Sequence, residues 1–228
     1  MTISVVIPAL NEADIIEHTL RAVDALSAPK EIIVVDGGST DDTANRAAPH
    51  AHVLHAPQGR ARQMNRGAQA ASGEVLWFLH ADTRPPEDAL RIIRDTLHQP
   101  GVESGLFRLG FNDNAPLLRF YSWCTRWPWI RLAFGDRGLF TTRAAFDAVG
   151  GFPEWPLFED LELADRLYRR GTFRFLPQAV TTSARRFRRY GLLRQQLRNL
   201  YLWTHYVIGT NPERLAHWYA YDSASTNE

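Results

Sequence analysis

The sequence predicts an α/β fold in which a doubly wound, mostly parallel sheet is followed by a mixed C-terminal part. One observation is that strand-like apolar segments alternate with helix-like segments four times over residues 3–97, with short connections. Such alternation is typical of parallel sheets joined by right-handed crossovers. The other is the segment at residues 75–79, where apolar residues follow one another without polar alternation. This pattern is typical of a central strand buried on both faces.

The elements of the first half follow from short apolar runs and from helical spacing. Strands are expected over residues 3–7, 31–36, 51–55 and 74–79. A helix opens at Asn11 or Glu12, because Ile16, Leu20 and Val23 recur at helical spacing. Further helices are expected over residues 59–72, after the turn at residues 37–42, and after Pro86.

Beyond Pro100 the elements are less regular. Strands are expected over residues 102–111 and 138–142 and, shorter, over 173–176 and 180–183, and helices over 159–170 and 190–208. In the helix at 159–170, Glu162 with Arg166 and Asp165 with Arg169 are spaced as i,i+4 ion pairs. Gly171 is expected to cap its C-terminus. The residues from Asn211 onward are expected to be loosely held.

Residues 116–134 are crowded with aromatic side chains and arginines, among them Trp123, Trp127 and Trp129. The arginines exclude a membrane-spanning helix. Three interpretations stand: a buried helix pair, a wall of an acceptor pocket, or an amphipathic segment at a membrane surface. Core packing is the default expectation, and attachment to a membrane surface stays open.

The composition restricts partners and compartment. Lys30 is the only lysine, so arginine carries the positive charge, which favours bidentate contacts to phosphate or carboxylate. The formal net charge of +1 argues against non-specific binding of nucleic acid. Cys124 is the only cysteine, which excludes a disulfide framework and a cysteine zinc site. With neither a signal peptide nor a run of ~18 apolar residues, we expect a cytoplasmic protein, with peripheral contact at the inner membrane face left open.

Polar side chains follow three of the predicted strands. Residues 8–12 follow the first strand, Asp36 ends the second, and His80 and Asp82 follow the fourth. Because the carboxyl ends of parallel strands open on one edge of a sheet, we expect a polar crescent suited to a nucleotide there. His80 and Asp82 suggest a metal or phosphate site. The alternative is that Asp36 and Asp82 cap the turns that follow them.

Two helix starts carry the other candidate groups. Arg60 and Arg62 follow Gly59 at a helix N-terminus, a place that favours anions. The alternative there is a solvated basic turn. Glu159 and Asp160 open a helix after the aromatic segment at residues 155–158. That segment can desolvate one carboxylate and raise its pKa toward that of a general base, although acidic residues also favour a helix start for its dipole alone.

Four segments in order along the chain carry a family resemblance: Val6-Ile7-Pro8-Ala9-Leu10-Asn11-Glu12, Val34-Val35-Asp36-Gly37-Gly38-Ser39-Thr40-Asp41, Leu79-His80-Ala81-Asp82 and Glu159-Asp160. The set resembles family 2 glycosyltransferases, of the fold called GT-A. Residues 135–140, 150–153 and 183–186 are similar to a subgroup of small soluble bacterial members labelled arsenosugar-biosynthesis or radical-SAM-associated transferases. The resemblance implies one GT-A domain over residues 1–228, with residues 1–100 binding the nucleotide sugar and 101–228 the acceptor and the catalytic base.

The resemblance also implies roles for individual residues. The nucleotide-binding set is Pro8, Ala9, Glu12, Asp36, Gly38, Arg60, Asn65, Ala81 and Asp82. The set toward the acceptor or the diphosphate is Trp155, Arg137, Arg186, Arg189 and Tyr190, where Tyr190 replaces a more usual Trp. Asp160, with Glu159 beside it, matches the catalytic base of inverting members. Asp82 matches the second carboxylate of an Asp-x-Asp motif that binds Mn²⁺ or Mg²⁺, and His80 replaces the first.

These features predict an inverting glycosyltransferase that moves a sugar from a nucleoside-diphosphate sugar, UDP-linked by resemblance, to a hydroxyl of a small or soluble acceptor. One alternative is a sugar nucleotidyltransferase, but Asn11-Glu12-Ala13 stands where that reaction favours a glycine-rich loop with a lysine. The other is a non-catalytic module that docks on a membrane or a partner through residues 123–129. The sugar, the acceptor and the oligomeric state stay open.

Overall fold

The computed structural model describes residues 1–133 and 135–224. In this part of the chain, eight strands form one sheet in the order β3-β2-β1-β4-β7-β6-β8-β5. The strands are β1 (Ile3–Ala9), β2 (Lys30–Asp36), β3 (His52–His55), β4 (Val75–Phe78), β5 (Thr83–Arg84), β6 (Val102–Phe111), β7 (Phe140–Thr142) and β8 (Thr172–Thr182). The first four are mutually parallel, β7 runs antiparallel to β4 and β6, and β8 is parallel to β6. The predicted doubly wound sheet with a mixed second part is confirmed.

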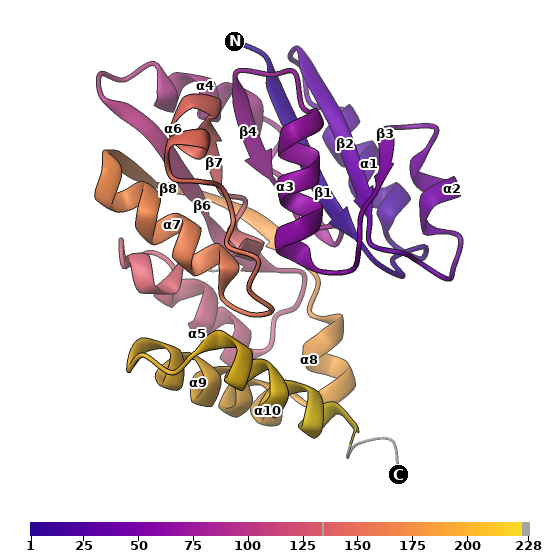
Figure 1. Ribbon diagram of the computed structural model, residues 1–228, viewed down its shortest axis with the longest axis vertical. Helices are drawn as coiled ribbons and strands as arrows, with labels where there is room; N and C mark the ends of the chain where they lie inside the picture. Colours follow the sequence, from indigo (N-terminus) through magenta and orange to yellow (C-terminus); the bar gives the residue numbers. More distant parts are fainter. Residues whose placement is uncertain (134, 225–228) are drawn as a thin grey trace.

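Helices cover both faces of this sheet (Figure 1). They are α1 (Ile16–Asp24), α2 (Thr43–Ala47), α3 (Arg60–Ala70), α4 (Ala89–Leu97), α5 (Pro116–Cys124), α6 (Arg143–Ala148), α7 (Glu159–Arg170), α8 (Arg185–Tyr190), α9 (Leu192–Val207) and α10 (Pro212–Ala224), with 3-10 turns at Ile130–Leu132 and Gly135–Arg137. α5, α8, α9 and α10 form a separate layer at the end of the molecule remote from the N-terminus (Figure 1).

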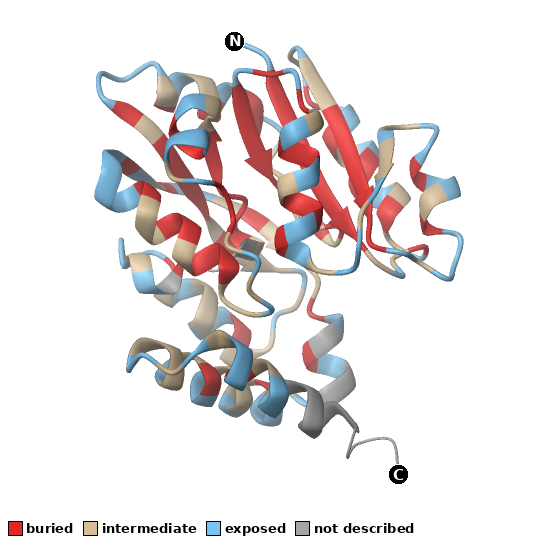
Figure 2. Ribbon diagram, viewed as in Figure 1, coloured by how far each residue is buried: buried red, intermediate tan, exposed pale blue. Residues whose placement is uncertain are grey.

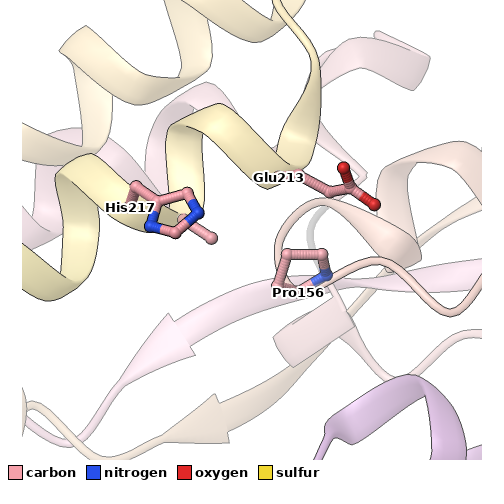
Figure 3. Close-up of a pocket in the computed structure, with 4 residues that line it drawn as sticks. Pro156, Glu213 and His217 are labelled. Atoms are coloured by element: carbon pink, nitrogen blue, oxygen red, sulfur yellow. The ribbon is translucent and has the colours of Figure 1, made fainter.

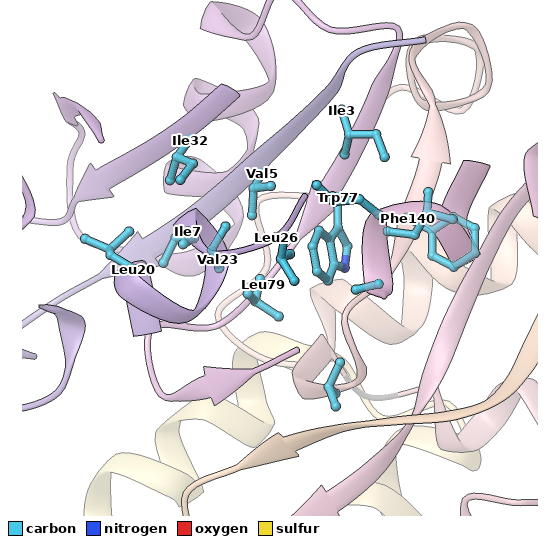
Figure 4. Close-up of a cluster of buried hydrophobic side chains, with 14 of the residues drawn as sticks. Ile3, Val5, Ile7, Leu20, Val23, Leu26, Ile32, Trp77, Leu79 and Phe140 are labelled. Atoms are coloured by element: carbon cyan, nitrogen blue, oxygen red, sulfur yellow. The ribbon is translucent and has the colours of Figure 1, made fainter. Parts of the chain in front are cut away.

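Side chains of the central strands alternate between two cores, one on each face. On β4, Val75 and Trp77 point into the core covered by α1 and α4, as does Leu79 directly after the strand. Leu76 and Phe78 point into the core covered by α3, α6 and α7. β1 and β4 are buried along their whole length and β2 over all but its first two residues, whereas the edge strand β3 is at least partly exposed throughout. Figure 2 shows the three buried strands as a continuous buried centre. Figure 4 shows the first core around Trp77, whose indole nitrogen donates a hydrogen bond to the carbonyl oxygen of Gly138 at 3.2 Å.

Gly67 allows α3 to pack closely on the sheet. A Cβ atom at this position would lie 2.3 Å from Cγ1 of Val6, a separation that real Cβ atoms do not show. Helix α3 therefore lies against β1 and β2, and its first turn is held beside the carboxyl ends of these strands. This close approach positions Arg60 and its neighbours at the sheet edge where the candidate site was expected.

Several predicted boundaries were wrong, and the reasons are mostly long-range hydrogen bonds. α1 begins at Ile16 rather than at Asn11 or Glu12. Asn11 is left-handed, with φ 53°, and the backbone N–H groups of Asn11 and Glu12 donate to Ser39 Oγ and Thr43 Oγ1 instead of starting a helix. The two strands expected after Gly171 are one strand, β8, whose pairing with β6 shifts register along its length. Gly171 ends α7 as expected, but in an extended conformation rather than as a left-handed cap.

The tail expected to be loosely held is instead the helix α10. Trp218 of α10 lies against the rings of Tyr201 and His205 on α9. Glu213 and His217 of α10 also line a shallow hollow together with Pro156, which precedes α7 (Figure 3). The aromatic contacts between α10 and α9, together with the contact of α10 near the start of α7, explain why this segment is folded.

The segment at residues 116–134 departs from the default expectation of core packing. Leu118 is buried, but Phe120, Trp123, Trp127 and Trp129 are exposed. Phe134 lies outside the described residues. Among the described residues, no helix combines the length and apolar character needed to cross a bilayer.

Candidate functional site

The carboxyl ends of β1, β2 and β4 meet at one edge of the sheet. Ala9, the last residue of β1, is opposite Asp36, the last residue of β2, and its carbonyl oxygen accepts a hydrogen bond from the Gly37 N–H at 2.9 Å. β4 pairs with the other side of β1. Pro8 and Ala9 are buried at this edge, as is Ala81 after β4. The predicted convergence of the strand ends is therefore present.

Asp36 organises the turn that follows it. Its Oδ2 accepts hydrogen bonds from the backbone N–H groups of Gly38 and Ser39 at 3.1 and 3.0 Å, and its Oδ1 accepts one from Ser39 Oγ. His55 Nδ1 lies 3.5 Å from Oδ2. Gly38 has a φ of 91°, which favours glycine in this turn. The turn-capping alternative thus describes Asp36 in this structure, with the carboxylate held rigidly at the sheet edge.

Gln63 is part of this edge and was missed by the sequence analysis. Its side chain is buried, and its amide nitrogen donates to the carbonyl oxygens of Ala9 and Val35, both at 2.8 Å. Gln63 therefore fastens α3 across the ends of β1 and β2. The only signal in the sequence was spacing: Gln63 lies four residues before Gly67, on the same face of the predicted helix.

Arg185 connects two of the predicted site residues and was also missed. Its guanidinium pairs with Glu12 after β1, and Nη2 lies 3.9 Å from Oδ2 of Asp82 after β4. The hydroxyl of Thr182 on β8 donates to Asp82 Oδ1 at 3.3 Å. The side chains of Glu12 and Asp82 are 18% and 22% exposed, so a ligand can reach them. This cluster joins the strand ends to the start of α8.

Glu159 and Asp160 form the first turn of α7, after a strained residue. Phe158, the residue before the helix, has a left-handed φ of 63° and stacks on Tyr206 of α9 with ring centroids 4.6 Å apart. Strain in a non-glycine residue of this kind costs about 1–3 kcal/mol and is common at functional sites. The stack on α9 and the buried apolar side of α7 hold the two carboxylates in place.

The two carboxylates have different surroundings. Glu159 is 1% exposed, and burial raises its pKa, against the opposing effect of Arg60. Arg60 Nε lies 3.1 Å from Glu159 Oε1 but without hydrogen-bond alignment, and neither oxygen of Glu159 has a hydrogen-bond partner among the described residues. Asp160 is 7% exposed, and its Oδ1 accepts from the N–H of Leu161 at 2.8 Å. The surroundings at the end of the aromatic segment, residues 155–158, thus exclude water from Glu159 more than from Asp160.

Asp136 brings these groups into one site. It lies in the 3-10 turn at Gly135–Arg137, and its Oδ1 is buried with no hydrogen-bond partner among the described residues. Burial, followed by the negative charges of Asp160 and Asp82, raises the pKa of Asp136 from 3.8 to about 7. Arg137 and Arg60 oppose the rise. Three carboxylates, from the end of β4, the 3-10 turn and the start of α7, therefore lie within electrostatic reach of one another.

Two other predicted site residues contact the backbone of neighbouring segments. Both atoms of the Asn65 amide pair with the backbone of Phe152, at 2.8 and 3.0 Å. Arg137 is buried and donates to the carbonyl oxygens of Phe107 and Thr125. Burial lowers the pKa of Arg137 to about 10. Asn65 therefore anchors the turn at residues 150–152, and Arg137 supports the turn that carries Asp136.

The remaining predictions concern residues near the site. Trp155 is partly exposed in the loop before α7, and His80 is partly exposed between β4 and β5. Arg186, Arg189 and Tyr190 fall in α8, but their side chains lie outside the described residues. Arg185, which contacts Glu12 and Asp82, is the first residue of the same helix.

The donor set suits a divalent cation that arrives with a phosphate ligand. Within the described residues, no three His, Cys, Asp or Glu side chains form a set that holds a metal alone. Mg²⁺ is usually bound through one or two carboxylates together with substrate phosphates. Asp82 is accessible to such an ion, and Asp136 has an unpartnered buried oxygen nearby. The site therefore fits an ion shared with a diphosphate better than a cage made by the protein alone.

Comparisons with known proteins agree with this architecture. The sequence pattern described as Glycosyl transferase family 2 matches residues 4–152. The protein named probable glycosyltransferase YdaM, from Bacillus subtilis, is 30% identical over 210 residues, which cover 78% of this chain and 50% of YdaM. The chain thus spans about half the length of this relative.

Solved structures share the fold. S. aureus TarS in complex with UDP-GlcNAc superposes with a TM-score of 0.64 at 18% identity, covering 80% of this chain and 58% of that one. The mannosyltransferase PcManGT from Pyrobaculum calidifontis, in complex with GDP-Man and Mn²⁺, gives 0.62 at 23% identity, covering 79% and 56%. These neighbours are glycosyltransferases of the GT-A fold. Because the family 2 pattern matches more than half of its residues, the chain belongs to the family 2 glycosyltransferases.

Proposed function

We propose that the protein is an inverting glycosyltransferase that moves a sugar from a nucleoside-diphosphate sugar to a hydroxyl of a small or soluble acceptor, in the cytoplasm. The observation that carries this proposal is the convergence of Asp82 and Asp160 on Asp136. It supports a site in which the strand ends hold the donor and the start of α7 meets the acceptor. Residues 1–100 are assigned to the donor and residues 101–228 to the acceptor and the base.

Asp160 is the proposed base. It takes the proton from the acceptor hydroxyl while the hydroxyl oxygen bonds to the anomeric carbon of the sugar, on the face opposite the diphosphate. The bond from that carbon to the diphosphate oxygen breaks, and its electron pair leaves with the nucleoside diphosphate. Positioned general bases contribute ~10²–10⁴-fold to rate. Asp160 is better suited than Glu159 because it is less enclosed, whereas Glu159 is almost fully buried against the Arg60 guanidinium.

The leaving group acquires negative charge, and the site has groups to receive it. Arg60 lies beside the Glu159 carboxylate, and Arg185 lies beside the Asp82 carboxylate. Mn²⁺ or Mg²⁺ on the diphosphate, held by Asp82, would supply further charge neutralisation. Preorganised cations of this kind stabilise charge that develops in the transition state.

The nucleoside is proposed to bind over Asp36, Pro8 and Ala9, with uracil as the base. Support comes from the convergence of these residues at the sheet edge and from the family's use of nucleotide sugars. Among the solved neighbours, one holds UDP-GlcNAc and another GDP-Man. The resemblance to the arsenosugar-biosynthesis subgroup remains a prediction about the subgroup and assigns no acceptor.

A thermal-shift panel of nucleoside diphosphates, each with and without Mn²⁺, tests the donor site. A ligand that binds only the folded protein stabilises it by RT ln(1 + [L]/Kd), so the correct base gives the largest shift. UDP with Mn²⁺ is expected to give the largest rise in unfolding temperature, and Asp82→Asn is expected to remove the part that depends on Mn²⁺. Equal shifts for all bases, or none, would contradict the proposal.

A further inference from the structure

Four exposed aromatic side chains form a continuous surface that the catalytic proposal does not use. Phe120, Trp123, Trp127 and Trp129 are 59%, 45%, 49% and 61% exposed. Successive rings are in contact, with centroids 5.9, 6.1 and 6.5 Å apart from Phe120 to Trp129. Scattered exposed apolar residues need no explanation, but a contiguous group of large rings marks an interaction surface.

Helix α9 exposes a second apolar surface in the same helical layer. More than half of each side chain is exposed at Leu193, Leu197, Leu200 and Tyr201. Their successive spacing of four, three and one residues is that of a single helix face, which globular proteins ordinarily bury. The indole nitrogen of Trp203 on α9 donates to the carbonyl oxygen of Arg131 at 2.8 Å, so α9 is attached directly to the segment that follows Trp129. Figure 1 shows α5 and α9 in the layer remote from the N-terminal half.

The charge of these two segments is entirely positive. Residues 116–135 contain three arginines and no Asp or Glu, and residues 184–212 contain six arginines and no Asp or Glu. Arg185 and Arg188 pair with carboxylates elsewhere in the chain, but Arg119, Arg126, Arg131 and Arg194 are exposed. The chain as a whole has a formal net charge of only +1. The positive charge is thus concentrated where the apolar side chains are exposed.

A surface that combines exposed apolar side chains with arginines fits only some kinds of partner. A two-fold dimer through this surface would bring two arginine-rich segments together without an acidic residue in either to pair with them. A single-stranded nucleic acid would use the rings but leave the aliphatic side chains of α9 exposed. An anionic membrane surface satisfies both parts, because tryptophan rings favour the lipid–water interface, leucine enters the acyl boundary, and arginine meets anionic headgroups.

We propose that the surface made by Phe120, Trp123, Trp127 and Trp129, with the outer face of α9, docks on an anionic lipid bilayer. The protein would lie on the membrane without crossing it. This inference does not depend on the proposed reaction, because it concerns a different surface and is measured by binding.

Flotation of the full chain with vesicles tests the inference. Binding is expected to vesicles of phosphatidylcholine that contain phosphatidylglycerol, to be much weaker with phosphatidylcholine alone, and to weaken as salt is raised. Trp127→Ser combined with Trp129→Ser, and separately Arg126→Gln combined with Arg131→Gln, are each expected to lower binding about tenfold or more. Brominated lipids should quench the wild-type tryptophan fluorescence and do so less in the double Trp variant.

Matched substitutions elsewhere separate this surface from general effects. Tyr168→Ser removes another exposed ring, and Arg91→Gln removes an exposed arginine on α4; both should leave vesicle binding unchanged. Thermal unfolding of every variant checks that it folds. Absence of flotation with anionic vesicles overturns the proposal, as does binding that survives both double variants. Self-association or oligonucleotide binding that the Trp variant abolishes, without vesicle binding, would assign the surface to a second copy or to nucleic acid instead.

Discussion

The guanidinium of Arg185 lies 3.9 Å from the carboxylate of Asp82 and pairs at the same time with Glu12. Asp82 is the residue expected to bind the divalent cation. Arg185 therefore lies next to the position expected for that cation. Burial lowers the pKa of Arg185, but the Glu12 carboxylate and, after it, the Asp82 carboxylate more than offset this effect and raise the pKa, so Arg185 stays charged. We therefore expect Arg185 to neutralise Asp82 in the absence of the proposed donor and to contact the diphosphate when the donor is bound.

Substitution of Arg185 by Gln should act in opposite directions on metal and nucleotide. Without nucleotide, Mn²⁺ is expected to bind the variant a few-fold more tightly, because an ion pair of this exposure is worth at most ~1 kcal/mol. The nucleoside diphosphate should bind more weakly, because one cation facing the phosphates is lost. Calorimetric titrations with Mn²⁺ alone and with UDP alone measure the two effects. Arg188→Gln, which removes the partner of Asp113 instead, is the matched control; the same effects in that variant would refute the assignment.

Asp160→Asn is expected to abolish sugar transfer while leaving nucleotide binding intact. The amide keeps the size of the side chain but removes the proton acceptor, so the loss should reach ~10²–10⁴-fold in kcat. Glu159→Gln keeps Asp160 and instead weakens the placement of Arg60, so it should raise the Kd for the nucleoside diphosphate more than Asp160→Asn does. Product formation and UDP titration separate the two variants. Loss of nucleotide binding in Asp160→Asn would remove the evidence for a catalytic base.

Asp136→Asn should stabilise the fold at neutral and alkaline pH. The pKa of Asp136 is raised from 3.8 to about 7 in the folded protein. Its favourable contribution is therefore fully present below about pH 4 and is lost as pH rises through about 7. The amide of the variant stays uncharged throughout, so the gain in unfolding free energy should grow between these values and then level off. Each pKa unit corresponds to ~1.4 kcal/mol, so the gain is of the order of a few kcal/mol. Denaturant titrations at pH 5 and pH 8, chosen as roughly the middle and the end of this window, measure it; a gain that shrinks with pH would contradict the assigned pKa.

The sequence was sufficient for the parallel half of the sheet and for the convergence of its strand ends. Apolar runs such as residues 75–79 determine buried strands locally, and parallel pairing then brings the residues after β1, β2 and β4 to one edge. The start of α7 at Glu159 was likewise correct, because its acidic first turn and apolar spacing are local signals.

The missed features depend on contacts between distant segments. Asn11 does not begin a helix because its backbone is left-handed, and hydrogen bonds to Ser39 and Thr40 of a distant turn hold it there. Arg185 reaches Glu12 across 173 positions of the sequence. Asp136 gains its unusual pKa from burial and from two carboxylates that the fold, not the local sequence, brings near it. Contacts of this kind can be predicted only once the order of the strands in the sheet is known.

Asn65 provides a test between a ligand contact and a structural role. Its amide donates to the carbonyl oxygen of Phe152 and accepts from the Phe152 N–H, so it fastens α3 to the turn at residues 150–152. Asn65→Ala would leave both backbone groups without their partner, at a cost of about 1–3 kcal/mol in unfolding free energy. For a chain of this size, the unfolding temperature should fall by roughly 2–4 °C per kcal/mol. The Kd for UDP should change little, because one N–H and the oxygen of the amide are bonded to the backbone of Phe152. Asn45→Ala, which removes an exposed amide bonded to Asp42, should change neither quantity. A large rise in the Kd for UDP with an unchanged unfolding temperature would support the ligand-binding role that the family resemblance implies for Asn65.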